Sequence, residues 1–406
     1  MDTGDTAWML MSTALVMIML PGLALFYGGL VRRKNVLSTT MHSFFGLALV
    51  SVVWVIVGFT LAFGPDVNGW GLIGGLDFAL FNGVGQEPST VYAVTIPFML
   101  FAMFQLMFAA ITPALITGAF AERKRFGSFV LFTILWSILI YSPIAHWVWS
   151  VNGWLFKLGA LDFAGGTVVH ISSGVSALVV ALMIGRRHMN GDSKEPHDVP
   201  MTVLGAGLLW FGWFGFNAGS AVTAGGLAAS AFTVTNIAAA AATITWVLAS
   251  YAKTRKVSVV GAACGAVAGL VAITPASGYV TPGGALIIGL VAGGLCYSAT
   301  LLRARSRVDD ALDVFAVHGV GGTFGAIATG IFASATVQTA YTGLLDGTPQ
   351  QLVTQAVAVG ATILYASIGT VVIVKVVDLL LGIRVKPEAE EMGLDLSVHG
   401  EAAYQV

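Results

Sequence analysis

The sequence predicts an all-α integral membrane protein with eleven transmembrane helices, its N-terminus outside and its C-terminus in the cytoplasm. Three observations lead to this prediction. Of the 406 residues, 57% are hydrophobic and only 10% are charged, whereas soluble domains carry about 25% charged residues. The apolar residues form runs long enough to cross a hydrocarbon core of about 30 Å, which takes roughly 20 residues of helix. The basic residues fall in alternate loops between these runs.

The expected spans are the apolar segments between charged or Gly- and Pro-rich stretches. They cover residues 7–31, 41–63, 91–120, 127–147, 165–185, 200–219, 226–252, 258–275, 283–302, 312–334 and 351–383. Cleaved signal peptides begin with a short basic region before their apolar run. Here the first basic residue, Arg32, comes after the first apolar run, so this run is expected to be a genuine span. A soluble protein with a buried core is disfavoured, because nothing amphipathic is left to form its outer shell.

The basic clusters predict the orientation, because Lys and Arg are retained on the cytoplasmic side of short loops. All but two of the 19 lysines and arginines follow spans 1, 3, 5, 7, 9 and 11. The clusters begin at Arg32, Arg123, Arg186 (joined by Lys194), Lys253, Arg303 and Arg384. The exceptions are Lys157 in an outside loop and Lys375 near the inner end of the last span. With the first basic loop inside, the N-terminus is outside, and an odd number of spans then places the C-terminus inside.

The odd count also predicts an inverted repeat, since a second five-span unit must enter the membrane with opposite topology. The stretch from Asp162 to His170 at the start of span 5 and the stretch from Asp313 to His318 in span 10 each have an acid at the start and a histidine one or two turns on. We expect a transmembrane domain over 1–383, with repeat one at about 7–185, repeat two at about 200–334 and span eleven at 351–383, followed by a cytoplasmic tail over 384–406.

Two histidines are expected near the middle of the membrane. At about 1.5 Å per residue, His170 lies roughly 10 Å in from the outer end of its helix and His318 roughly 12 Å in from the inner end of its own. An ionisable side chain in hydrocarbon usually faces the bundle interior or a cavity. A single one is more often a hydrogen-bonded packing residue, but two at related positions favour a pathway lining. We expect a neutral pair that shares one N–H···N bond and could relay protons or bind a small polar solute.

Asp162 and Asp313 begin their helices, where a carboxylate satisfies free backbone N–H groups and complements the helix dipole. Capping and a functional role are both open for these two acids. Asp162 opens on the outer side, where a cationic solute would arrive.

Aromatic residues of spans 3 and 6 and one that follows span 4 give a second signal. They are Phe104 and Phe108 with Gln105 on one side of span 3, Trp149 after span 4, and Trp213 and Phe216 with Ser220 toward the outer end of span 6. Interfacial Trp and lipid-facing Phe are common, so a structural role is the alternative for each. If some converge, their ring faces and one hydroxyl would form a cation site that needs no carboxylate.

The sequence disfavours other kinds of chemistry. It contains no HExxH, no GxSxG and no Gly-Lys pair for a phosphate loop. Two histidines without nearby acidic ligands make a poor metal site, so we expect no metal and no cofactor. Cys264 and Cys296 sit in separate apolar runs and are expected to be packing residues. A net charge of −1 without a long basic stretch gives no reason to expect nucleic acid as a partner.

These residues resemble the Amt/Mep/Rh family of ammonium transporters, and its bacterial and archaeal Amt branch in particular. The resemblance covers essentially the whole chain and is strongest over residues 118–126, 160–170, 212–220 and 309–319. It implies eleven helices in two inverted five-helix repeats, assembled as a homotrimer in the cell membrane with one pore per subunit.

The resemblance also implies roles for individual residues. Trp149, Phe108 and Ser220 would form the outer ammonium site, with Asp162 beneath it. Phe108 and Phe216 would be the stacked rings that close the outer end of the pore, and His170 and His318 would be the twin-histidine pair. Phe104, Gln105 and Trp213 would support these groups. The tail resembles the segment through which Amt proteins couple subunits and meet the cytoplasmic PII signalling protein; a solvated acidic tail is the alternative.

The energetic cost of moving ions into an apolar pore predicts the mechanism. Moving an ammonium-sized ion into low dielectric costs of order 20 kcal/mol by the Born estimate, whereas neutral ammonia carries no such penalty. We therefore expect ammonium or methylammonium to bind outside, lose a proton and cross as the neutral amine. Whether the proton also crosses is open. The alternative functions are an ammonium sensor, a transporter of another small solute and, least favoured, an intramembrane enzyme.

Overall fold

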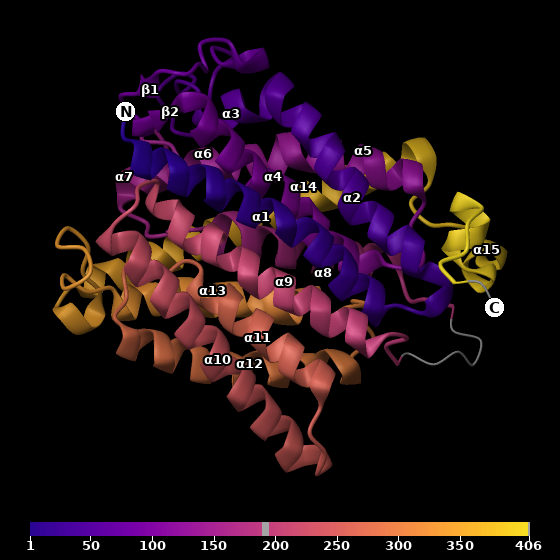
Figure 1. Ribbon diagram of the computed structural model, residues 1–406. Coiled ribbons are helices and arrows are strands. Elements are labelled where there is room, and N and C mark those ends of the chain that lie inside the picture. Colours follow the sequence, from indigo (N-terminus) through magenta and orange to yellow (C-terminus); the bar gives the residue numbers. More distant parts are fainter. Residues whose placement is uncertain (189–194, 405–406) are drawn as a thin grey trace.

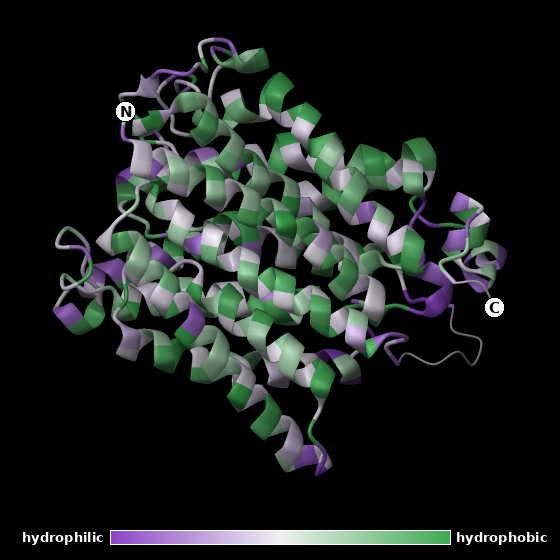
Figure 2. Cartoon of the chain, viewed as in Figure 1, coloured by the Kyte–Doolittle hydropathy of each residue, from purple (hydrophilic) through white to green (hydrophobic). Residues whose placement is uncertain are grey.

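The structure, a computed structural model, describes residues 1–188 and 195–404. Lys194, which we counted among the basic residues, and the last two residues of the tail lie outside the described residues. Figure 1 shows a bundle of long helices that run side by side, with β1 (Pro88–Ser89), β2 (Ala93–Pro97) and α7 (Trp154–Leu158) at one end and α15 (Pro387–Met392) at the other. Hydrophobic residues fill the length of the bundle and hydrophilic residues gather toward its ends (Figure 2). This is the polarity that a membrane-spanning bundle requires.

Ten helical segments among the described residues are long and apolar enough to cross a membrane. They are Thr3–Leu30 (α1), Arg33–Phe63, Phe98–Phe120 (α4), Phe126–Leu158, Gly166–Ile184, Val199–Ala221, Gly226–Thr254 (α10), Pro282–Arg305 (α12), Phe315–Phe332 and Pro349–Leu381 (α14). The eighth predicted span appears as a shorter apolar helix, α11 (Val259–Ile273). The all-helical class is confirmed, whereas the count of eleven and the orientation stay predictions.

Several of these segments consist of more than one helix. Segment 33–63 contains α2 (Val36–Val53) and α3 (Phe59–Phe63), and segment 126–158 contains α5 (Phe126–Trp136), α6 (Ser142–Trp149) and α7 (Trp154–Leu158). Segments 166–184, 199–221 and 315–332 contain α8 (Ser172–Ile184), α9 (Val199–Ala218) and α13 (Val320–Phe332).

The third span is shorter than we predicted. We expected it to begin near residue 91, but α4 begins at Phe98. The preceding residues form a strand, β2 (Ala93–Pro97), which pairs antiparallel with β1 (Pro88–Ser89). Proline disfavours helical geometry in the residue before it, so Pro97 marks the point at which the extended chain turns into helix.

The two histidines lie in widened helical turns at the start of their spans. Residues Gly166–Ile171 and Phe315–Gly319 form π-helical turns that lead into α8 and α13. Such turns are rare and are found mostly at functional sites. The two segments pack against one another, and α1 packs along α9 elsewhere in the bundle. The bundle thus brings together elements from the two halves of the chain.

A close backbone approach makes this contact possible. A Cβ atom on Gly174 would overlap the backbone of Gly319, and a Cβ atom on Gly322 would lie 2.8 Å from the Cβ of His170. Only glycine at these positions allows the two helices to pack at this distance. The glycines therefore set the separation of the two histidine side chains.

Candidate pore

Three cavities follow one another through the bundle. The outer cavity has a volume of about 260 Å³ and is lined by Gln105, Phe108, Trp149 and Ser220 among others. A narrow space of about 10 Å³ is lined by Phe216 and both histidines. The inner cavity has a volume of about 340 Å³. His318 lines both the narrow space and the inner cavity, so these two are adjacent.

The outer cavity brings together aromatic rings and one hydroxyl. The ring of Trp149 is perpendicular to that of Phe108, with their centroids 5.9 Å apart. The indole N–H of Trp149 donates to the carbonyl oxygen of Asp162 at 3.0 Å, which fixes the ring. The hydroxyl of Ser220 donates to the carbonyl of Phe216 at 2.8 Å and leaves its oxygen as an acceptor. Ring faces with an acceptor oxygen suit a small cation.

Gln105 is a further polar group of this cavity. Its Oε1 is buried and has no hydrogen-bond partner among the described residues. A buried unpaired carbonyl is costly unless a water or a ligand meets it. The cavity therefore holds two acceptor oxygens beside its aromatic walls.

A pair of phenyl rings closes the inner end of the outer cavity. The rings of Phe108 and Phe216 are 4.2 Å apart between centroids and tilted by 32°. Each side chain is 1% exposed, and Phe104 packs against Phe108 at 4.9 Å. No path for a hydrated ion passes between rings at this distance, so a solute has to displace at least one of them.

The two histidines meet directly behind these rings. Nδ1 of His318 lies 3.2 Å from Nδ1 of His170, a distance at which one ring donates to the other. His170 is stacked on Trp213, with centroids 5.6 Å apart, and Trp213 donates its indole N–H to Thr274 at 2.9 Å. The expected N–H···N pair is thus present, in a narrow space whose other walls are mainly apolar.

Asp162 caps the helix that carries His170. Its Oδ1 accepts the backbone N–H groups of Gly165 and Gly166 at 2.8 and 2.5 Å. Its Oδ2 accepts those of Thr167 and Val168 at 2.8 and 3.2 Å, and also the Thr167 hydroxyl. Every lone pair of the carboxylate is occupied, so capping is confirmed for this residue. Asp162 does not line the outer cavity with its carboxylate free.

Asp313, for which capping was one of two open roles, does not cap the His318 helix with its side chain. It adopts a left-handed backbone conformation with φ of 58°, and its carboxylate forms two bonds with Arg303 at 2.7 and 2.9 Å. The cap of the His318 helix is Asp310, whose Oδ2 accepts the N–H of Phe315 at 2.7 Å. Because the carboxylate of Asp313 is bound by Arg303 on α12, it is not available to accept the free backbone N–H groups at the start of the His318 helix.

The sequence contains a signal for Asp310 that we missed. Asp310 precedes His318 by eight residues, the same separation as from Asp162 to His170. Unlike Asp162, it has one oxygen, Oδ1, without a partner among the described residues. Burial and the charge of Asp313 raise the pKa of Asp310 to about 6.

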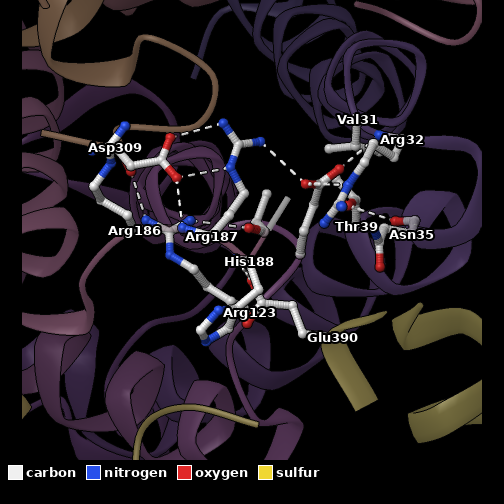
Figure 3. A network of polar contacts seen from close by, with 12 residues as sticks. Val31, Arg32, Asn35, Thr39, Arg123, Arg186, Arg187, His188, Asp309 and Glu390 are labelled. Atoms are coloured by element: carbon white, nitrogen blue, oxygen red, sulfur yellow. Dashed lines mark hydrogen bonds and ion pairs between the residues drawn. The ribbon is translucent and has the colours of Figure 1, made fainter. Parts of the chain in front are cut away.

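The inner cavity opens beside a network of charged side chains (Figure 3). Arg187 pairs with Asp309 at 2.8 Å and with Glu122 at 3.1 Å, and Glu122 also pairs with Arg32 at 2.9 Å. Although burial alone would raise the pKa of Asp309, the hydrogen bonds and charge of Arg187 hold it well below its usual range. The network joins the loops that follow spans 1, 3, 5 and 9.

The tail is docked onto this end of the bundle. Glu390 is buried and accepts the backbone N–H of His188 at 2.6 Å and a guanidinium N–H of Arg384 at 2.8 Å. Asp395 accepts the N–H groups of Leu37 and Ser38 at 3.1 and 2.8 Å, at the start of α2. These acids make specific contacts, in contrast to the alternative of a solvated acidic tail.

The sequence model of the Ammonium Transporter Family matches residues 7–404 of this chain. The chain belongs to the ammonium transporter family. This ammonium transporter family member is 53% identical over 407 residues to a Bacillus subtilis ammonium transporter, covering 100% of this chain and 99% of that relative. It is 49% identical over 405 residues to ammonium transporter Amt1 of Archaeoglobus fulgidus, with both chains covered completely. The Amt branch that the sequence predicts is therefore confirmed.

Solved structures of the ammonium transporter family share this fold. The Mep2 structure from Saccharomyces cerevisiae has a TM-score of 0.89 at 38% identity, over 96% of this chain and 88% of that chain. A structure described as "Sensor Amt Protein" has a TM-score of 0.88 at 32% identity, over 97% of this chain and 98% of that chain. Together with the ten apolar spans, these similarities make the chain a multi-pass membrane protein.

Most residues that the sequence predicted for the site do line it or support it. The outer cavity contains Trp149, Phe108, Ser220 and Gln105, whereas Asp162 lies behind it as a cap. Sequence reasoning missed Phe26 and Tyr27 of α1 and Val267 of α11, which line both the narrow space and the inner cavity. They are apolar or aromatic residues in apolar runs, so nothing in their spacing distinguishes them from ordinary core residues.

Proposed function

We propose that this protein conducts ammonium across the cell membrane, taking up the ion in the outer cavity and passing neutral ammonia between the two histidines. One observation carries the proposal: an aromatic cavity, a closed ring pair and a histidine-lined narrow space follow one another in a chain of the ammonium transporter family. The named relatives at 44–53% identity are ammonium transporters, which supports a transport function over catalysis.

Recruitment begins with the walls of the outer cavity. Ammonium would lie against the rings of Trp149 and Phe108, since a ring face attracts a cation by about 0.5–1 kcal/mol at an exposed site and about 2 kcal/mol when desolvated. It would donate to the oxygen of Ser220 and to the unpaired Oε1 of Gln105. A dehydrated Na⁺ or K⁺ ion cannot donate hydrogen bonds, so these acceptors favour ammonium and methylammonium.

Deprotonation precedes passage of the rings. The narrow space is too small and too apolar to hold a hydrated cation, and a bare ion there would be penalised by several kcal/mol. Ammonia has no such penalty and needs only one hydrogen-bond partner at a time. The shared N–H···N bond between His170 and His318 provides both a donor and an acceptor. For a proton to pass, one would have to arrive at the free Nε2 of the donating ring, the shared proton would move to Nδ1 of the other ring, and that ring would release its own Nε2 proton. Transport with net charge transfer is therefore compatible with the pair. Asp162 acts at a distance, by holding the His170 helix and the carbonyl that fixes Trp149.

The proposed assembly follows the sequence prediction. We propose eleven transmembrane helices with α11 as the eighth, the N-terminus outside and the tail inside. The equal spacing of the capping acids and the two π-helical turns support two inverted repeats. A homotrimer with one pore per subunit is proposed from the family resemblance.

The tail is proposed as a regulatory element that meets a PII protein. Support comes from its contacts: Glu390 ties the tail to the loop after span 5, and Asp395 ties it to the start of α2. A partner that displaces the tail would act on that loop and on the start of α2 directly.

A sensor function is the second candidate. It is favoured by the likeness to the structure described as "Sensor Amt Protein", which covers nearly the full length of both chains. A sensor would bind ammonium in the same outer cavity and change tail contacts without sustained flux, so a flux measurement separates the two functions.

The test is uptake of labelled methylammonium into proteoliposomes. We expect the parent to transport, and His170→Ala and His318→Ala each to lose transport or selectivity against K⁺. His188→Ala is the matched control, because that imidazole is exposed and only its backbone N–H makes a described bond. Unchanged uptake and selectivity in both pore variants would refute the histidine assignment. Saturable ammonium binding without flux by the parent would favour the sensor.

A further inference from the structure

A buried glutamine of the last long helix holds the loop that precedes the His170 helix. Gln355 lies about two turns into α14 and is 1% exposed. Its Oε1 accepts the backbone N–H of Leu161 at 2.7 Å, and its Nε2 donates to the carbonyl oxygen of the same residue at 2.8 Å. The side-chain amide therefore pairs with the backbone of Leu161 as a residue of a neighbouring β-strand would.

The loop needs such a partner because it has no regular structure of its own. Residues 160–162 belong to no helix or strand, and Leu161 is buried. Its N–H and C=O groups would be costly without a hydrogen-bond partner. A side-chain amide offers one donor and one acceptor side by side, whereas an ionised carboxylate only accepts. Glutamine thus satisfies both backbone groups of this residue at once.

The same amide also contacts the second half of the chain. Nε2 of Gln355 donates a further hydrogen bond to the carbonyl oxygen of Ala326 on α13 at 2.9 Å. A Cβ atom on Gly330 of α13 would lie 2.9 Å from Cγ of Gln355, so this glycine allows α14 to come close. Gln355 therefore joins the loop at Leu161 to the helix that follows His318.

Asp162 follows Leu161 directly and acts on the outer end of the pore in two ways. Its carbonyl oxygen accepts the indole N–H of Trp149 at 3.0 Å, and its carboxylate caps the helix that follows. On its other side, the backbone N–H of Phe163 donates to the carbonyl oxygen of Pro275 at 3.1 Å. Asp162 is thus held between two anchors, of which the one at Leu161 is a single side chain.

We propose that Gln355 is a positioning residue for the outer cavity: it fixes the Asp162 carbonyl and thereby the orientation of the Trp149 ring toward the cation. This inference rests on the proposed uptake of ammonium in that cavity. A cation–π contact requires the cation to lie over the ring face, so a ring that is free to tilt binds more weakly. Gln355 itself does not line the outer cavity, and the eleventh span therefore acts on the site without touching the ion.

The first test is hydrogen exchange of the purified full-length protein, measured by mass spectrometry. Gln355→Met keeps an unbranched side chain of similar size and removes every hydrogen bond of the amide. We expect the backbone amides of residues 160–168 to exchange roughly tenfold faster or more, because the loop and the cap that it carries lose their hold. This measurement needs neither ligand nor transport, so its failure is separate from a failure of the proposed function.

The matched control is Tyr365→Phe on the same helix. The Tyr365 hydroxyl donates to the carbonyl oxygen of Leu139 at 2.8 Å and makes no described hydrogen bond to residues 159–163. We expect this variant to leave exchange over residues 160–168 unchanged. If Gln355→Met does not elute as a single species, Gln355→Glu replaces it, since an ionised carboxylate cannot donate to either carbonyl oxygen.

The second test separates positioning from a loss of folded protein. We expect Gln355→Met to raise the KM for methylammonium uptake by roughly two- to thirtyfold, the range of one cation–π contact, and Tyr365→Phe to leave KM unchanged. In a Trp149→Ala background the same substitution should change KM by less than about twofold, because the ring that it positions is absent. If the parent takes up no methylammonium, the proposed function fails, and the Kd for ammonium from calorimetry takes the place of KM.

Two results would overturn the inference. One is exchange over residues 160–168 of Gln355→Met that equals the parent's. The other is an unchanged KM or Kd with only a lower maximal rate, which is the effect of less folded protein.

Discussion

Replacing Asp162 by asparagine removes the charge that holds the start of the His170 helix. In the parent, the two carboxylate oxygens accept four backbone N–H groups and one hydroxyl within residues 165–168. An asparagine side chain keeps one acceptor oxygen, and its NH₂ group would face N–H donors in place of the second oxygen. At least two of the five bonds are lost, and their donors stay buried.

The size of the effect follows from these bonds. A hydrogen bond to a charged group contributes about 1.5–3 kcal/mol, so the loss of two lowers the free energy of unfolding by roughly 3–6 kcal/mol. The first turn of the helix also loosens, which shifts His170 relative to His318 and should reduce methylammonium uptake as well.

Unfolding by SDS in mixed micelles measures the first effect, and uptake into proteoliposomes measures the second. Asp346→Asn is the control, since Asp346 is exposed and accepts one described backbone N–H, that of Ala335 at 2.9 Å. We expect the control to stay within about 1 kcal/mol of the parent. If Asp162→Asn also stays within that margin, the carboxylate does not hold the helix start and the reasoning is wrong.

Three further outcomes are expected. Phe216→Ala removes one ring of the closed pair and should lower the free energy of unfolding by about 3–5 kcal/mol while raising K⁺ leak in proteoliposomes; an unchanged leak would contradict a barrier role. Gly174→Ala forces the histidine segments apart and should cost about 1–3 kcal/mol together with uptake, whereas Gly360→Ala, which meets nothing within 4 Å, should do neither. Asp309→Asn removes one of the two carboxylates paired with the buried guanidinium of Arg187 and should lower stability by up to about 3–5 kcal/mol at neutral pH. Because the fold lowers the pKa of Asp309, its contribution is present above the unfolded value of about 3.9 and is lost as the pH falls below it, so stability curves of parent and variant should converge in acid.

The sequence predicts the fold well where hydrophobicity alone decides. Long apolar runs end at charges, so the positions of most spans follow directly from them. The third span was misplaced because residues 91–97 are apolar enough to continue the apolar run of span 3. Their β-branched residues and Pro97 favour the strand that the structure has there. The apolar composition of residues 258–275 likewise predicts a span, whereas the helix there, α11, has 15 residues. Its length depends on the neighbouring helices that cover it.

The site was predictable to the extent that its residues are unusual in a membrane. Histidines and acids in apolar runs stand out, which is why His170, His318 and Asp162 could be named. Asp310 and Asp313 are both plausible caps by composition, and the choice between them depends on Arg303, which reaches Asp313 from another helix. Sequence reasoning missed Tyr27 and Val267, which line the pore because segments far apart in the sequence pack together. No local sequence pattern distinguishes such residues from ordinary core residues.

The short helix α11 has a consequence for how this protein is made. Its 15 residues extend about 22 Å, less than the roughly 30 Å of hydrocarbon, and the chain that follows it is non-helical and buried from Thr274 to Gly278. Non-helical backbone at that depth is tolerated only when other protein surrounds it. During synthesis, α11 leaves the ribosome before α12 and α13, which later cover it. This segment, which supplies Val267 to the pore wall, is therefore not stable in lipid until α12 and α13 have been inserted. Formation of the complete pore wall is thus a late step of membrane insertion.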